Sequence, residues 1–200
     1  KYGTDVTVAQ KATAPGYTFD GWSKSGTFQM PAEDVTITGK FVANTNTAYK
    51  VEHYLQNMDN DEYTLHETET LAGTTGETVT AVAKTYDGFT LNEAAAGTVK
   101  SGTIAGDGSL VLKLYYTRNS YKVTYSYEGT VPAGASALPA EATYKYGADV
   151  TVADKATASG YTFDGWSKTE DFKMPAENVT ITGKFVANTN TAYKVEHYWQ

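Results

Sequence analysis

The chain has 200 residues, no cysteine and a formal net charge of -7, and these figures exclude several classes of protein. Without cysteine there is no disulfide framework, no thiolate zinc site and no thiol nucleophile. An acidic chain with a single arginine is a poor nucleic-acid binder, and no apolar run approaches the roughly 18 residues of a membrane-spanning helix.

Composition and alternation predict a mainly β protein. Threonine (32), valine (16) and tyrosine (16) outnumber leucine (8) and isoleucine (3), and the first three suit a pleated, half-buried surface. Alternating apolar and polar residues predict strands, in chain order, at 49–55, 63–71, 98–104, 109–117, 121–127, 149–153, 161–166 and 179–186. A short helix is expected over Glu77–Tyr86, where apolar residues recur at helical spacing, although its β-branched residues favour a strand.

The most informative feature is an internal repeat. Residues 1–54 and 145–198 align at an offset of 144 without a gap, and 46 of the 54 positions are identical. Four of the eight differences fall within residues 25–29 of the first copy and 169–173 of the second. Such clustering is typical of an exposed loop, where substitution costs little.

A second periodicity divides the 144-residue period into two kinds of module. Similar strand openings recur at Tyr49, Tyr121 and Tyr193, at spacings of 72 and 72 residues. We therefore predict an alternating A-B-A-B array of modules of about 70 residues. The predicted boundaries are a partial A segment without its first strand (1–43), a complete B segment (44–118), a complete A segment (119–187) and the start of a further B segment (188–200).

Two motifs in the second A segment resemble a known repeat family. YTFDGW at Tyr161–Trp166 is followed by MPA at 174–176 and NVTIT at 178–182, and the first A segment carries the same motifs at 16–22 and 30–36. This pattern resembles the Listeria–Bacteroides repeat, also called the internalin-type B-repeat.

The B segment is similar to a second family, the mucin-binding-protein type of repeat from large Gram-positive surface proteins. The similarity is carried by YKVEHY at 49–54, ETE at 67–69, GTTG at 73–76 and SLVLKLYY at 109–116. Together the two resemblances cover nearly the whole chain.

The resemblances imply a fold, a location and a role. They imply an α+β ubiquitin-like β-grasp fold for each module and an extracellular, cell-wall-associated protein of Gram-positive type, of which this chain is a fragment without signal peptide or anchor. The expected function is a tandem-repeat stalk of a cell-surface adhesin that projects a distal domain. The alternative is that the repeats themselves bind mucin glycans or a host surface protein. The junctions at 44–47 and 118–120 are short and lack a Gly/Ser run, which favours a restricted module orientation.

Four aromatic residues are the candidate ligand-facing side chains: Tyr161 and Trp166, with Tyr17 and Trp22 at the equivalent positions of the first copy. Sugars stack on aromatic faces, so these residues could form a carbohydrate platform. Core packing is the stronger interpretation, because small β modules have few other residues large enough to fill them.

No catalytic residue, cofactor site or metal site is expected, and the chain is not predicted to be an enzyme. Asn57, Asp59 and Asp61 have the spacing of the start of a calcium loop, but the glycine and the glutamate that an EF-hand requires are absent. The histidines lack metal-ligand spacing. An isopeptide crosslink from Lys113 or Lys122 to an asparagine or an aspartate would need a buried lysine, but both lysines alternate with apolar residues and are expected to point outwards.

The resemblance implies a host glycan or mucin as a partner. Nucleic acid and membrane insertion of this segment are not expected from its charge and hydropathy. The missing first strand of the first A segment should leave an unpaired sheet edge. Strand pairing with a neighbouring chain at the truncated ends would cover such an edge.

Overall fold

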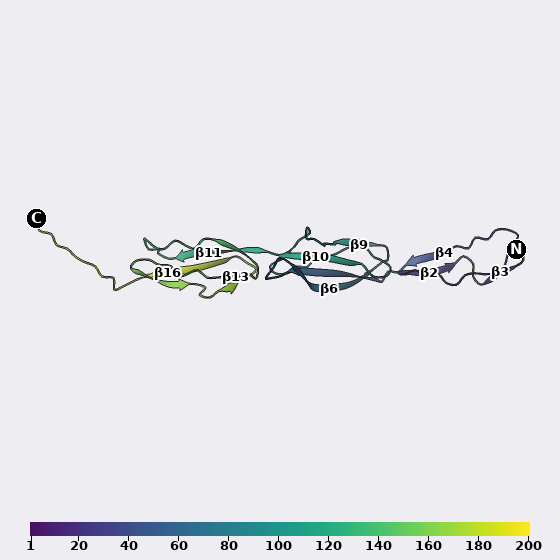
Figure 1. The fold of residues 1–200 in the computed structure, drawn as a ribbon, viewed down its shortest axis with the longest axis horizontal. Helices are drawn as coiled ribbons and strands as arrows, with labels where there is room; N and C mark the ends of the chain where they lie inside the picture. The colour runs from purple at the N-terminus through teal and green to yellow at the C-terminus, as the bar shows by residue number, and fades with distance from the viewer. The chain divides into compact units, whose positions relative to one another are not determined.

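The structure is a computed structural model that describes every residue from Lys1 to Gln200. It contains strands and no helix, so the expectation of a mainly β protein is confirmed (Figure 1). The chain divides into two compact units. Unit 1 comprises residues 1–55, 63–84 and 91–116, and unit 2 comprises residues 56–62, 85–90 and 117–200.

The first A segment, in unit 1, forms two small antiparallel sheets. Strand β1 (Asp5–Thr7) pairs with β3 (Thr27–Gln29), and β2 (Tyr17–Trp22) pairs with β4 (Gly39–Ala43) (Figure 1). The β2–β4 register shifts between Phe19 and Gly21. Gly21 has a φ of 119° there, which side chains other than glycine rarely adopt.

The B segment forms a four-stranded sheet in the order β6-β5-β10-β8. Its strands are β5 (Thr47–Gln56), β6 (Tyr63–Gly73), β8 (Phe89–Leu91) and β10 (Val111–Arg118). The central pair, β5 and β10, is parallel, with Val51 opposite Leu112. Both side chains are almost fully buried and form a core with Tyr49 and Ile104.

The helix expected over Glu77–Tyr86 does not form, so the α part of the predicted α+β class is wrong. Thr78–Thr80 is strand β7, which pairs antiparallel with β9 (Ser101–Thr103), and the rest of the expected helix has no regular structure. The run Thr78-Val79-Thr80 is β-branched, which lowers helix propensity, and a strand partner is at hand. Here the β-branched content outweighs the helical spacing.

The second A segment, in unit 2, forms a four-stranded sheet with the analogous order β12-β11-β16-β14. Its strands are β11 (Ser120–Glu128), β12 (Ala142–Lys145), β14 (Tyr161–Trp166) and β16 (Val179–Ala187), and β13 (Asp149–Val150) pairs with β15 (Phe172–Lys173) beside it. The central pair β11–β16 is again parallel. The buried core includes Val123, Phe163, Trp166, Met174 and Ile181.

The two A segments differ beside residues 35–38, because the first has no equivalent of β11 to pair with them. In the second, β11 pairs with residues 179–184, and Ile181 is fully buried. The same VTIT sequence at residues 35–38 of the first A segment has no strand assignment, and its Ile37 is only half-buried. Residues 35–38 thus have no strand partner in this chain, although Thr38 exchanges hydrogen bonds with Ser23 on one side. The expectation that a neighbouring chain covers the other side stays a prediction.

Residues 188–200 repeat the sequence of 44–56 with one substitution but form no strand. Tyr193 is 88% exposed, whereas its counterpart Tyr49 in β5 is 9% exposed. The shared run TAYKVEHY is therefore a strand where a partner such as β10 is present and has no regular structure where none is.

Candidate functional site

The candidate aromatic residues of the second A segment occupy two environments. Trp166 is 6% exposed and packs against Tyr127, with stacked rings 5.7 Å apart, and against the edge of Phe163 at 4.8 Å. Its indole Nε1–H donates to the carbonyl of Asp154 at 2.9 Å. Most of the Trp166 ring is therefore packed in the core, whereas Tyr161 lies at the surface and is 36% exposed.

In the first A segment the equivalent residues are more accessible. Trp22 is half-buried, because no counterpart of Tyr127 covers it. Tyr17 is 39% exposed and lies beside the B segment, where a Cβ added at Gly76 would be 3.6 Å from the Tyr17 hydroxyl. The structure therefore places Tyr17 at a contact between segments.

That contact is the first of two tightly packed joints, and it lies within unit 1. Pro15 and Gly16 press against Gly106 so closely that a Cβ on Gly106 would lie 2.0 Å from the Pro15 carbonyl oxygen. Backbone hydrogen bonds run from Asn44 to the Gly16 carbonyl and from Thr75 to the Asn44 carbonyl, both at 2.9 Å. Only glycine allows this approach of two backbones.

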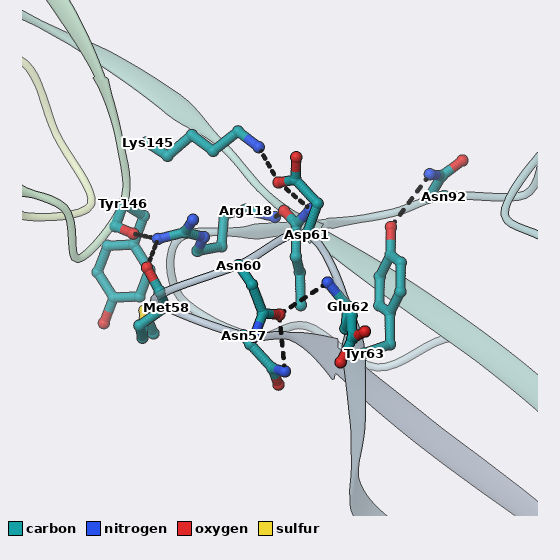
Figure 2. A network of polar contacts seen from close by, with 11 residues as sticks. Asn57, Met58, Asn60, Asp61, Glu62, Tyr63, Asn92, Arg118, Lys145 and Tyr146 are labelled. Atoms are coloured by element: carbon teal, nitrogen blue, oxygen red, sulfur yellow. Dashed lines mark hydrogen bonds and ion pairs between the residues drawn. The ribbon is translucent and has the colours of Figure 1, made fainter.

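The second joint lies within unit 2 and centres on Arg118, the last residue of β10 (Figure 2). Its side chain is 8% exposed, and Nη1 donates to the carbonyl oxygens of Met58 at 2.6 Å and Tyr146 at 3.1 Å. The Arg118 backbone N–H donates to Gln56 Oε1 at 3.1 Å. One guanidinium thus connects the turn after β5 to the residue that follows β12.

The turn beside Arg118 is the stretch with partial calcium-loop spacing. Asn60 Oδ1 accepts hydrogen bonds from the Glu62 backbone N–H at 2.9 Å and from Asn57 Nδ2 at 3.0 Å (Figure 2). Asp61 pairs with Lys145 at 2.5 Å, and this hydrogen bond is the main reason why the pKa of Asp61 lies below its usual range. These polar groups satisfy one another and hold the turn against the second A segment.

Aromatic and backbone contacts complete the second joint. Tyr146 meets the edge of Phe89 at a centroid distance of 5.6 Å, and a Cβ on Gly88 would lie 2.4 Å from the Tyr146 ring. Asn119, the first residue of the second A segment, donates its N–H to the Gly88 carbonyl and accepts from the Tyr146 N–H, both at 2.8 Å. The connecting residue is therefore hydrogen-bonded on both sides.

Sequence reasoning identified the short junctions but missed the residues that hold them. Arg118 is the only arginine in the chain and stands at a junction. Its guanidinium has several hydrogen-bond donors on a long side chain, and this was the signal in the sequence that Arg118 could hold the junction. Gly106 gave no signal beyond its place in a turn, because its role depends on the distant Pro15.

The B segment also contains a buried polar network around His53, whose side chain is fully buried. His53 Nε2 lies 3.1 Å from Glu69 Oε2, and Nδ1 lies 3.0 Å from the Tyr116 hydroxyl. Since a carboxylate only accepts, Nε2 carries the proton and Nδ1 accepts from Tyr116. The Tyr116 hydroxyl in turn accepts the Lys84 backbone N–H at 3.0 Å.

Charged side chains pair with one another at the surface beside this network. Lys84 Nζ pairs with Glu69 at 2.9 Å and also with Glu67. The hydrogen bond from Lys84, followed by that from His53, holds the pKa of Glu69 below its usual range. Burial raises the pKa of Tyr116. The arrangement fixes the His53 tautomer and ties β5 and β10 to the segment after β7.

The structure contains neither a cluster of metal-ligand side chains nor a membrane-spanning helix. Nowhere do three or more histidine, aspartate or glutamate side chains gather in a way that could hold a metal ion. The chain also contains no helix that could span a lipid bilayer.

Comparisons with protein families agree with the motifs in the sequence. Residues 121–191 match the Listeria-Bacteroides repeat domain, residues 1–45 the divergent InlB B-repeat domain, and residues 51–128 the MucBP domain. The chain therefore consists of tandem segments similar to repeat domains of Gram-positive surface proteins. In particular, the predicted resemblance to the Listeria–Bacteroides and mucin-binding repeat families is confirmed.

Proteins similar to the chain include one curated relative and one solved structure. It is 26% identical over 180 residues to internalin J of Listeria monocytogenes, a match that covers 82% of this chain but only 19% of that protein. Among solved structures it is similar to Streptococcal High Identity Repeats in Tandem (SHIRT) domains 3-4 from a cell surface protein. That likeness has 16% identity and a TM-score of 0.27, over 68% of this chain and 96% of the other.

Proposed function

We propose that the chain is a stalk segment of a bacterial adhesin, in which tandem repeats project a distal domain from the cell wall. The supporting observation is the packing at both ends of the B segment. Gly106 meets Pro15 and Gly16 at one end, and Arg118 binds the Met58 and Tyr146 carbonyls at the other. Within unit 1, the contact of Gly106 with Pro15 and Gly16 holds the first A segment against the B segment, whereas a flexible Gly/Ser connection would not.

The module boundaries and the β-grasp fold belong to this proposal. The B segment and the second A segment share one strand order, second-first-fourth-third, with a parallel central pair. Such an order is what a β-grasp module without its helix would have. Boundaries at 43/44 and 118/119 leave each four-stranded sheet within one segment, in keeping with the 72-residue spacing of the strand openings.

The proposed location is extracellular and wall-associated. Support comes from the families matched and from internalin J, of which the chain spans about a fifth. The negative net charge of -7 favours solubility of a surface-exposed array. Structural repeats of this kind require no catalytic residues, so we propose no enzymatic activity.

The proposal is tested by measuring length against repeat number. Chains with one, two and three 144-residue periods are compared by small-angle X-ray scattering. A stalk predicts a maximum dimension that rises by a constant increment per period. Replacing Arg118 by alanine should reduce that increment, because the second joint loses its buried donor. A dimension that levels off as periods are added would contradict the proposal.

The alternative function, glycan binding by the repeats themselves, is supported by a different feature: a groove that both A segments contain.

A further inference from the structure

A shallow groove recurs at the same place in the two A segments. In the first, a hollow of about 330 Å³ lies between residues 8–11 and the turn at 21–26, with Trp22 in its lining. In the second, a hollow of about 280 Å³ lies between residues 152–155 and 165–171, with Trp166 at the equivalent position. Because it forms in both copies, the groove is a property of the repeat.

Hydrogen bonds hold the walls of both grooves in place. In the first A segment the Val8 N–H donates to the Gly26 carbonyl at 2.9 Å, and Trp22 Nε1 donates to the Gln10 carbonyl at 3.2 Å. In the second, Val152 N–H donates to Asp171 Oδ1 at 2.9 Å, alongside the Trp166 bond. A preformed groove lowers the entropy that a ligand must overcome on binding.

Two lysines of the first groove have no anionic partner. Lys11 and Lys24 line it, and neither lies within ion-pair distance of a carboxylate. Eight other lysines of the chain do form ion pairs, so the groove lysines are left for another anion. Lys24 Nζ lies 5.0 Å from the centre of the Phe28 ring, which restricts its position.

The two grooves share their lysines but differ in charge. Lys155 and Lys168 replace Lys11 and Lys24, again without an ion-pair partner. The second lining adds Asp154 and Asp171, where the first copy has Gln10 and Thr27. The formal charge of the lining is therefore +2 from two lysines in the first groove, and zero from two lysines and two aspartates in the second.

We propose that the first groove binds an acidic saccharide, with its carboxylate or sulfate held by Lys11 and Lys24 and its ring against Trp22. The paired lysines supply charge complementarity. The indole of Trp22 in the lining supplies an aromatic contact for the sugar ring, and the hollow has the size of a small-ligand site. The second groove, whose lining has no net charge, binds such a sugar more weakly. This inference rests on the alternative function, glycan binding, and is independent of the stalk function.

The test is a nuclear magnetic resonance titration of the whole chain, followed through its three tryptophan indole N–H signals. The probes are 3′-sialyllactose for the carboxylate, lactose 3′-sulfate for the sulfate, and lactose as the neutral control. Trp199, 99% exposed, is assigned with Trp199→Phe. The Trp22 signal is expected to shift at millimolar acidic sugar, more than the Trp166 signal and less at high salt. Which acidic probe binds more tightly identifies the anionic group.

Matched variants in the same chain locate the site. Replacing Lys11 and Lys24 by alanine should weaken binding about tenfold, while replacing Lys155 and Lys168 should leave the Trp22 response unchanged. Asp154→Gln, which copies the first groove, should strengthen the Trp166 response. Lactose that binds as tightly as the acidic sugars, or sulfate ion that binds as tightly as lactose 3′-sulfate, would overturn the proposal. So would an unmoved Trp22 signal.

Discussion

At the scale of single residues, His53 and His197 form a comparison within the chain. They occupy the same place in identical sequences, TAYKVEHY. His53 is fully buried with hydrogen bonds at both ring nitrogens, whereas His197 is exposed. The side chain is the same, but only the buried copy leaves partners unsatisfied when it is removed.

We predict that His53→Leu lowers the free energy of unfolding by about 2–4 kcal/mol, because the Tyr116 hydroxyl and a Glu69 oxygen lose their buried partner. His197→Leu should change it by less than about 0.5 kcal/mol. Urea denaturation followed by circular dichroism checks both. Equal effects of the two substitutions would show that the hydrogen bonds of His53 do not contribute to the free energy of unfolding.

Glu69 gives a pH prediction. Hydrogen bonds from Lys84 and His53 hold its pKa below the usual range, so the folded state favours the ionised carboxylate. Its contribution to stability is therefore present above the usual carboxyl pKa and is lost as the pH falls through the lowered value. Glu69→Gln should make the decline in stability between about pH 5 and about pH 3 shallower. Urea unfolding of both proteins across this pH range checks the prediction. Parallel curves of the free energy of unfolding against pH for the variant and the unchanged chain would contradict it.

At the scale of elements, the strands were largely predictable and the joints were not. Alternation located β5, β6, β10, β11, β14 and β16 to within a few residues. In all of these but β6, at least one residue is buried, whereas in β6 the apolar Leu65 and Leu71 are exposed. The helix over Glu77–Tyr86 failed because its spacing signal was weaker than the pairing of β7 with β9. The approach of Gly106 to Pro15 could not be predicted, since it joins residues about 90 positions apart.

The first joint is tested by a pair of equivalent glycines. Gly16 and Gly160 have φ values of 75° and 76°, so alanine suffers the same backbone strain at both. At Gly16 the new Cβ would also lie 2.3 Å from Gly106 Cα, while at Gly160 the nearest atom is Thr191 Oγ1 at 3.8 Å. Gly16→Ala should therefore destabilise the chain more than Gly160→Ala.

The readout for this pair is amide hydrogen exchange at Thr75, whose N–H donates to the carbonyl of Asn44, the residue that bonds Gly16 across the joint. Protection at Thr75 should fall in Gly16→Ala and persist in Gly160→Ala. Unchanged protection in Gly16→Ala would mean that the backbone contact at Gly106 does not hold the joint.

The unpaired edge at residues 35–38 gives a prediction about strand addition. Residues 120–144 of the second A segment, fused before Lys1, would supply the equivalents of β11 and β12. We expect Ile37 to become buried and the amides of 35–38 to gain protection from exchange. A synthetic peptide of 120–128, added in trans, tests whether a neighbouring chain can take this place. Amides that remain unprotected in the fused chain would contradict the shared fold.

At the scale of the whole molecule, the boundaries predict which part folds alone. All residues of the unit 2 core lie within 119–187, with Trp166 as the only tryptophan of that segment. We expect this fragment to unfold cooperatively in urea, with a shift of Trp166 fluorescence. Residues 1–43, which lack the central strand, should show no cooperative transition at Trp22. Similar behaviour of the two fragments would place the boundaries elsewhere.

The groove of the A segments shows what sequence could and could not give for the candidate site. The YTFDGW motif indicated Trp22 and Trp166 as either ligand-facing or core residues, and the structure gives each indole both a packed side and a place in a groove lining. The unpaired lysines were not singled out. Their position beside the indole depends on how the segment after β1 or β13 folds back, which local patterns do not encode.

The parallel pairing of β11 with β16 has a mechanical consequence. These are the first and last strands of the second A segment, and they lie side by side from Val123 opposite Val179 to Glu128 opposite Lys184. A force that pulls the two ends of the segment apart acts along both strands in opposite directions. It therefore loads the whole ladder of hydrogen bonds in shear, and the bonds must break together rather than one after another. A repeat with this strand order resists tension, such as shear flow over a cell surface, without a covalent crosslink.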